Sequence, residues 1–299
     1  MITAFTTVFL LFGLGFGVQR WRPLSEQTLA QLSGLVVEIL LPFYLFFTTA
    51  TSATPEALSR APVVIGTGVA VSLLSYLLAT LALKPAAVSA TQRSAFRFSI
   101  MASNTAFLGI PICAALFGPL GAVYAVLFDF GATLVAMTFG IWELNGGRLD
   151  RWRPIVFNPL IWGIVAGLGW AVLGWAFPAW LAEPLEKLGG TTLPMALLVG
   201  GAQIGAVRAP GAGRRRQLGG LVAIRLMVAP LLVAGVLAAV GGHDLVARVI
   251  VIEAAMPTGL ATAIMAKTYG ADAEFAASGL LWSTLMSLIS LPLVAVLLI

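Results

Sequence analysis

Charged side chains are scarce in this chain of 299 residues: Lys, Arg, Asp and Glu make up 10% of it, while 60% of its residues are apolar. An ordinary soluble domain is about 45–50% apolar and about 25% charged. The mean hydropathy of the chain is +1.00. These values exclude a water-soluble globular domain and indicate an integral membrane protein.

The sequence also has only one cysteine, Cys113, and one histidine, His243. A single cysteine excludes an internal disulfide and a cysteine-rich metal site. His243 stands beside Asp244 in a short loop, and no combination of nucleophile, base and metal ligands is visible elsewhere in the sequence. We therefore predict no metal, no cofactor and no enzymatic activity.

Long apolar runs fill nearly the whole chain. A helix needs about 20 residues to cross a hydrocarbon layer of about 30 Å. The connections between the runs are short, and the runs are continuous, whereas barrel strands would alternate in polarity. The predicted spans of an all-α membrane protein with ten transmembrane helices are residues 2–18, 28–50, 61–83, 93–116, 119–143, 157–177, 181–206, 217–240, 245–267 and 272–298.

The basic residues are distributed unequally between the two sets of loops, which predicts the orientation of the chain. One set has only Arg60, Lys187 and Arg248. The other set, formed by the odd-numbered loops, has Arg20, Arg22, Lys84, Arg93, Arg97, Arg148, Arg151, Arg153, Arg208, Arg214, Arg215, Arg216 and Lys267. We expect the odd-numbered loops in the cytoplasm and both termini outside it, in a bacterial inner membrane. A basic run beside a membrane helix is typical of a topology signal or a contact with membrane lipids, so we predict no nucleic-acid partner.

The sequence contains a weak internal repeat. Placing Leu41-Pro42 on Leu193-Pro194 also places Gly118 on Gly270, without a gap. The predicted repeats are residues 1–150 and 151–299, with five helices each. Because five is odd, the second copy enters the membrane from the opposite side, and an inverted repeat of this kind is the usual basis of alternating access in carriers.

Predicted helices 4 and 9 are interrupted near their middles. Helix 4 contains Asn104 to Pro111, and helix 9 contains Glu253 to Gly259. Proline has no N–H and its ring clashes with the carbonyl four residues earlier, so it kinks or breaks a helix. Freed backbone groups must face protein or water rather than lipid. The alternative interpretation is two ordinary proline kinks.

If the two breaks meet at the membrane midplane, they form one binding site. The N-terminal end of a half-helix attracts an anion, and Asn104 can add an amide donor. Gln203 in helix 7 either lines the cavity or forms a hydrogen bond between helices. The predicted substrate-binding residues are Asn104, Thr105, Gly109, Pro111, Pro257, Thr258 and Gln203.

Ionisable residues inside the membrane are costly and call for a partner or a function. Asp129 in helix 5, Arg225 in helix 8 and Glu253 in helix 9 are predicted to couple or compensate charge during transport. Protonation of Asp129 would couple proton movement to substrate movement. The alternatives are an ion pair between Asp129 and Arg225, or a neutral carboxyl held by hydrogen bonds.

Three segments resemble the auxin efflux carrier family, in the compact form of bacterial members without the long central loop of many plant PIN proteins. They are NTAFLGIP with Gly118, the stretch from Arg225 to Pro230, and MPTGLATAIMAKTYGADAE followed by residues 283–287 and Leu291-Pro292. The resemblance covers nearly the whole chain. Bacterial relatives are described as malate or malonate permeases, and the family name is no evidence that this protein carries auxin.

The resemblance implies a 5+5 inverted repeat like that of the NhaA antiporter and the bile-acid symporters. Helices 1, 2, 6 and 7 would form a scaffold, and helices 3–5 and 8–10 would form a transport unit. It also implies that helices 4 and 9 cross at Pro111 and Pro257, that a substrate carboxylate lies near Asn104, and that the scaffold forms a homodimer.

We therefore predict a secondary transporter of small mono- or dicarboxylates that works by an elevator mechanism. A negative interior favours anion export, since one charge moved across 100 mV is worth about 2.3 kcal/mol. One alternative is a sodium-coupled symporter of the bile-acid-carrier type. A channel and a receptor-like binding protein are the others.

Overall fold

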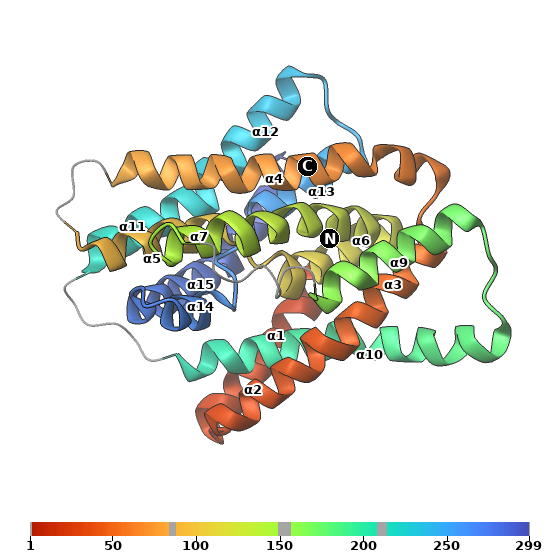
Figure 1. The fold of residues 1–299 in the computed structure, drawn as a ribbon, viewed down its shortest axis with the longest axis horizontal. Coiled ribbons are helices and arrows are strands. Elements are labelled where there is room, and N and C mark those ends of the chain that lie inside the picture. The colour runs from red at the N-terminus through yellow and green to blue at the C-terminus, as the bar shows by residue number, and fades with distance from the viewer. Residues whose placement is uncertain (1, 84–87, 149–156, 208–213, 299) are drawn as a thin grey trace.

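The computed structural model describes residues 2–83, 88–148, 157–207 and 214–298. The described residues form helices that run mostly along the long axis of the molecule (Figure 1), and the one extended pairing among them is an isolated bridge. Helices long and apolar enough to cross a membrane are Ile2–Trp21, Glu26–Ser52, Pro55–Ala82, Thr105–Leu144, Arg215–Ala239 and Ala273–Leu297. The all-helical prediction is therefore confirmed.

The first half of the chain forms long helices with polar N-caps. The helices, including the π-helical turns η1 to η3, are α1 (Ile2–Trp21), α2 (Glu26–Gly34), η1 (Leu35–Leu40), α3 (Leu41–Ser52), α4 (Pro55–Ala82), α5 (Ala90–Met101), η2 (Thr105–Gly109), α6 (Ile110–Val135), η3 (Ala136–Gly140) and α7 (Ile141–Leu144). Thr54 caps α4 by accepting the N–H of Ala57, and Pro55 stands in the first turn. Because these start signals are polar and proline-containing, the predicted span of 61–83 begins six residues too late.

The second half contains α9 (Pro159–Leu173), α10 (Ala179–Ala206), α11 (Arg215–Ala223), η5 (Ile224–Val228), α12 (Ala229–Ala239), α13 (Leu245–Ala254), α14 (Thr262–Thr268) and α15 (Ala273–Leu298). Asp244 caps α13 through the N–H of Ala247 and also pairs with Arg60 of α4. The Ala247 N–H and the Arg60 guanidinium hold the pKa of the Asp244 carboxyl below its usual range.

Glycines bring certain helices into backbone contact. A Cβ on Gly15 or Gly201 would lie 2.0 or 1.9 Å from a backbone oxygen of the facing helix, which joins α1 to α10. A Cβ on Gly163 would lie 2.5 Å from the Pro42 oxygen, which joins α9 to α3. Gly131 likewise joins α6 to α4, with 2.1 Å to the Ile65 oxygen. The helices thus pack as two groups, α1–α3 with α9 and α10, and α4–α7 with α11–α15.

Replacing Gly201 with alanine is expected to destabilise the protein by about 1–3 kcal/mol, because the new methyl group overlaps the Phe12 carbonyl and forces α1 away from α10. The unfolding temperature in detergent measures the effect. Gly17→Ala is the matched control, since a Cβ there meets nothing within 4 Å. Equal unfolding temperatures for the two variants would contradict the close packing.

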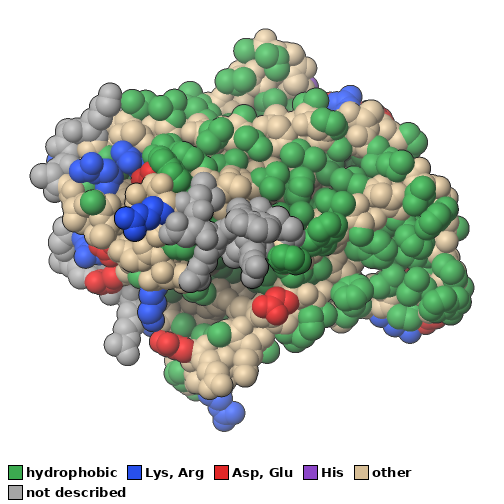
Figure 2. Space-filling model, viewed as in Figure 1, with side chains coloured by type: hydrophobic (Ala, Val, Ile, Leu, Met, Phe, Trp, Pro, Cys, Tyr) green, Lys and Arg blue, Asp and Glu red, His purple; other side chains and the backbone are tan. Residues whose placement is uncertain are grey.

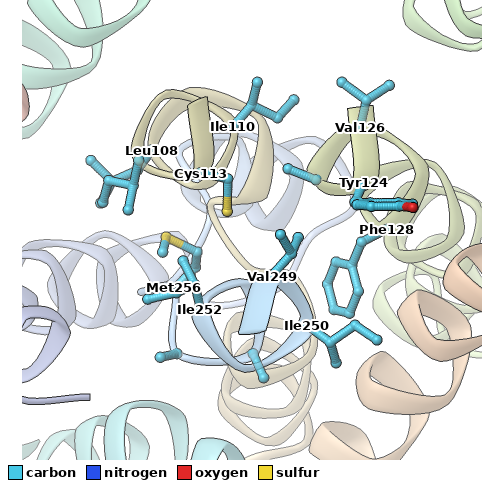
Figure 3. Packing of buried hydrophobic residues seen from close by; sticks show 14 of the residues in the cluster. Leu108, Ile110, Cys113, Tyr124, Val126, Phe128, Val249, Ile250, Ile252 and Met256 are labelled. Atoms are coloured by element: carbon cyan, nitrogen blue, oxygen red, sulfur yellow. The ribbon is translucent and has the colours of Figure 1, made fainter. Parts of the chain in front are cut away.

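The apolar core lies between α6 and α13. Figure 3 shows Cys113 and Phe128 of α6 pointing toward α13, which carries Val249, Ile250 and Ile252. All five are buried. The end of α13, at Ala254, belongs to this core, whereas Phe98 and Met101 at the end of α5 belong to a separate buried cluster.

The surface is apolar over a broad area and charged mainly at one end. Figure 2 shows Lys and Arg side chains gathered at the left, where Figure 1 places α5 and α11. Four of the predicted basic loop residues, Lys84, Arg151, Arg153 and Arg208, lie outside the described residues.

Candidate functional site

Two helices end inside the protein, and the chain segments that follow them cross. The helix α5 ends at Met101 and α13 ends at Ala254. Beyond them, Ser103 and Thr258 form an antiparallel bridge. The Asn104 N–H donates to the Pro257 carbonyl at 2.8 Å, and the Gly259 N–H donates to the Ala102 carbonyl at 2.9 Å. The two interrupted segments therefore meet at one point.

The interruption of helix 4 does not lie at Pro111, as the sequence suggested, but at residues 102–104. Pro111 is the second residue of α6 and continues the helix that begins at Thr105. The preceding turn η2 is π-helical, with the Ile110 N–H bonded to the Thr105 carbonyl, which accommodates the missing proline donor without a break. The crossing in this segment is therefore made by Ser103 and Asn104, and the prediction that Pro111 marks it is wrong.

Arg225 donates hydrogen bonds to backbone carbonyls of both chain segments that meet at the crossing. Its Nε donates to the Met256 carbonyl at 2.6 Å, and its Nη2 donates to the Ala254 carbonyl at 3.2 Å. Its Nη1 donates to the Ile100 carbonyl at 3.0 Å and to the Ser75 hydroxyl at 3.2 Å. The side chain is 1% exposed. The guanidinium thus supplies donors to carbonyls at the C-terminal ends of both half-helices, where the helix dipoles favour a cation.

Asp129 does not pair with Arg225. Its carboxylate accepts a hydrogen bond from the Thr105 hydroxyl, and none of the ion pairs among the described residues includes Asp129. The alternative of an Asp129–Arg225 ion pair is therefore wrong. The aspartate is 2% exposed and belongs to the wall of a cavity.

Glu253 lies behind the crossing, against α6. Its Oε1 is 3.5 Å from the Cys113 Sγ, and its Oε2 has no hydrogen-bond partner among the described residues. A Cβ on Gly109 would lie 2.2 Å from this Oε2. Gly109, predicted as a substrate ligand, therefore makes room for the buried carboxyl of Glu253.

A cavity of about 180 Å³ lies beside the crossing. Its polar wall is formed by Ser103, Asn104, Thr105, Asp129, Thr133, Asn158 and Thr262. Its apolar wall includes Val37, Phe107, Met137, Leu160, Leu260 and Met265. Drug-sized ligands occupy cavities of about 300–1,000 Å³. The volume therefore fits a small molecule of a few carbon atoms.

The cavity contains both groups that attract an anion and a carboxyl group that can carry a negative charge. The Asn104 Nδ2 is a buried amide donor with no partner among the described residues, and the helix that starts at Thr105 has free N–H groups in its first turn. These groups and the positive end of the helix dipole favour a carboxylate or another anion. Asp129 adds a negative charge whenever it is ionised. The site can therefore hold an anion together with one compensating positive charge or proton.

The other predicted ligands serve different roles. The Thr258 hydroxyl donates to the Ser99 carbonyl at 2.9 Å and its N–H donates to the Ser283 hydroxyl, so this residue fixes the crossing. Pro257 contributes its carbonyl to the crossing. Gln203 donates to the Ser33 hydroxyl between α10 and α2.

Pro111 lines a second cavity, of about 650 Å³. That cavity is formed by α1, α3, α6 and α10, and its wall includes Tyr44, Gly118 and Leu197. None of the residues that line it also lines the cavity beside Asn104. The two cavities therefore share no wall, and only the smaller one is lined by residues of the crossing.

Besides Ser103, which stands next to Asn104, three polar residues of the smaller cavity were missed in the sequence. Thr133 follows Asp129 by one helical turn and so shares its helix face. Asn158 caps α9 before Pro159, and Thr262 begins α14. The spacing of Thr133 could have been recognised, whereas the other two resemble ordinary helix starts. Among the described residues, no three acidic, histidine or cysteine side chains gather as a metal site would require.

Comparison with known proteins gives two matches to a family model and two similar relatives. The model, described as a membrane transport protein, matches residues 1–151 and 147–295. An uncharacterized transporter of Methanothermobacter thermautotrophicus is 27% identical over 298 residues, which cover 98% of this chain and 96% of the relative. An uncharacterized transporter of Methanocaldococcus jannaschii is 24% identical over 302 residues, covering 96% and 95%.

Proposed function

Because the chain belongs to the membrane transport protein family, the family of the auxin-efflux-carrier-like transporters, we propose that it is a secondary carrier of small organic anions. The family assignment implies transport rather than enzymatic catalysis. The observation that carries the proposal is the unpartnered amide of Asn104 beside the start of the η2–α6 helix, in a small cavity at the crossing. Mono- and dicarboxylates of a few carbon atoms are the substrates that fit this volume and these donors.

The carrier works by an elevator motion of one helix group against the other. Glycine-mediated backbone contacts lie within the groups, whereas Gly200 of α10 faces the other group through side chains alone. A Cβ on Gly200 would lie 3.3 Å from the Leu260 Cδ1 and 3.8 Å from the Phe107 Cδ1. Such side-chain contacts can slide, while interlocked backbones resist motion. The first group is the scaffold and the second is the transport unit.

The two halves form a 5+5 inverted repeat of ten transmembrane helices. Two observations support this proposal. Both halves contain an interrupted helix that contributes to one crossing. Gly118 and Gly270, which the sequence alignment pairs, have φ angles of 71° and 74°. With ten spans both termini lie on the same side of the membrane, which the distribution of basic loop residues predicts to be outside the cytoplasm, and the scaffold is the surface on which a homodimer would form.

Coupling to sodium is disfavoured by Arg225. Unwound carbonyls and C-terminal half-helix ends are the groups that bind Na⁺ in related architectures. Here the carbonyls of Ile100, Ala254 and Met256 already accept hydrogen bonds from the guanidinium. Asp129 is the group that would carry a proton with the anion, because it lies in the same cavity as Asn104.

Purified protein in liposomes, on a solid-supported membrane, tests the function. Concentration jumps of small carboxylates are expected to give saturable transient currents that do not require sodium. Protein-free liposomes are the control, and the corresponding primary alcohols test the need for the carboxylate. Strict sodium dependence would favour the symporter, and a conductance that never saturates would favour a channel.

A further inference from the structure

A third cavity has no lining residue from the crossing segments 102–104 and 256–259. It has a volume of about 550 Å³ and lies between α12, α13 and the end of α15. Figure 1 shows α12 projecting away from the other helices. None of its lining residues belongs to either of the other two cavities. Its occupant is therefore independent of the transported substrate.

One wall of this cavity is apolar. It is formed by Leu231, Ala234, Ala238, Val251 and Leu297. From Leu231 to Ala238 the helix rises by about 10 Å, at 1.5 Å per residue. The wall is therefore long enough to contact a stretch of hydrocarbon chain that runs along α12.

The opposite end of the cavity is polar and basic. Arg248 and His243 line it, and no Asp or Glu belongs to the lining. Arg248 is exposed and has no side-chain hydrogen bond or ion pair among the described residues. The nearest acidic residue in sequence, Asp244, is already bound by Arg60 and by the Ala247 N–H. The guanidinium thus faces the cavity without a counter-ion.

We propose that this cavity binds an anionic phospholipid. The headgroup phosphate is bound by Arg248, with a hydrogen bond from the His243 imidazole, and one acyl chain lies against α12 and α15. A cation at a helix end next to an apolar groove matches the amphipathic structure of a phospholipid, and basic pockets between transmembrane helices bind anionic headgroups. Guanidinium groups also bind phosphate oxygens in a bidentate manner. The lipid closes the gap between α12 and the rest of the transport unit.

Gly235 provides a variant that fills the cavity without disturbing the fold. A Cβ at this lining position meets nothing within 4 Å, and its φ is not positive. Gly235→Leu should therefore occupy the space of the acyl chain. Gly169→Leu on α9 is the matched control, because a Cβ there also meets nothing within 4 Å and Gly169 lines none of the three cavities.

The experiment measures lipid adducts by native mass spectrometry of delipidated full-length protein, titrated with phosphatidylglycerol or with phosphatidylcholine of the same acyl chains. We expect the first phosphatidylglycerol to bind at least fivefold more tightly than phosphatidylcholine. Arg248→Gln should remove this preference, and Gly235→Leu should weaken binding of both lipids. Lys187→Gln, which removes an exposed cation paired with Glu183, and Gly169→Leu should change neither.

Several outcomes would overturn the proposal. These are equal binding of the two lipids by the wild-type protein, or a preference for phosphatidylglycerol that Arg248→Gln and Lys187→Gln reduce equally. Inorganic phosphate that abolishes lipid binding at millimolar concentration would indicate a free-anion site. A dimer that dissociates in Gly235→Leu would show that a second copy of the chain occupies the cavity.

Discussion

Replacing Arg225 with methionine is expected to abolish transport and to lower the unfolding temperature by at least about 6 °C. The variant leaves the carbonyls of Ile100, Ala254 and Met256 without donors inside the protein. Each buried unsatisfied group costs about 1–3 kcal/mol, and 1 kcal/mol corresponds to about 2–4 °C in a domain of a few hundred residues. Transport is lost because Asn104 is placed by the same crossing.

Arg225→Lys separates the charge from the hydrogen-bond geometry. Lysine keeps the positive charge at the ends of α5 and α13, but its single ammonium group cannot reach carbonyls on both segments in the way that a guanidinium fork does. We expect an intermediate unfolding temperature and weak transport. Arg93→Met is the control, because Arg93 is exposed and its guanidinium donates only a long hydrogen bond, of 3.4 Å, to the Val88 carbonyl. Arg225→Met with the wild-type unfolding temperature would show that the guanidinium does not hold the crossing.

The general architecture could be predicted from the sequence because it depends on long, strong signals. Apolar runs of about 20 residues identify membrane helices whatever their tertiary contacts. The interruption of helix 9 was also placed correctly, since Met256 and Pro257 lie in the extended crossing segment. Start points such as Thr54 were harder to place, because a cap is a local polar signal outside the apolar run.

The position of the break in predicted helix 4 could not be predicted from its proline. A proline can break a helix, or it can stand in the first turn of an α-helix that follows a π-helical turn. Pro42, Pro111 and Pro230 each follow a π-helical turn and stand second in the next α-helix. A π-helical turn shifts the hydrogen bonds and removes the need for the proline N–H. Only tertiary contacts decide between this arrangement and a break. In predicted helix 4 the bridge between Ser103 and Thr258 fixes the break at residues 102–104.

The partners of the buried charged residues also depend on tertiary contacts. Arg225 and Asp129 are both buried charged residues, and the sequence gives no reason to prefer backbone carbonyls over a carboxylate as the partner of the guanidinium. In the structure the guanidinium from η5 binds the carbonyls of Ile100, Ala254 and Met256, at the C-terminal ends of α5 and α13. Thr258 was expected to bind substrate, but its hydroxyl is used by the Ser99 carbonyl.

Asn104→Asp is expected to reduce anion transport at neutral pH by at least about 100-fold. The substitution keeps the side-chain shape but replaces the free amide donor with a second carboxylate beside Asp129. Two like charges 4 Å apart repel by about 4 kcal/mol at an effective dielectric constant of 20, and 1.4 kcal/mol is a factor of ten. Asn104→Ala removes only one hydrogen bond to a charged group, worth about 1.5–3 kcal/mol, so its affinity should fall about 10–150-fold.

Asp129→Asn separates substrate binding from proton coupling in the same cavity. The variant keeps the Asn104 amide and the helix start at Thr105, so it should still bind and move the anion, but its transport rate should no longer vary with pH between 5 and 8.

Currents and unfolding temperatures of all three variants, Asn104→Asp, Asn104→Ala and Asp129→Asn, should be measured together. Thr268→Val is the control, because the Thr268 hydroxyl bonds only within α14. Wild-type currents in Asn104→Asp would show that Asn104 does not bind the anion. A pH profile of Asp129→Asn that equals that of the wild type would show that Asp129 does not carry the coupled proton. A loss of transport in Asn104→Asp with a normal unfolding temperature would locate the defect in anion binding, because the crossing that holds the helix ends is made by backbone groups that this substitution leaves in place.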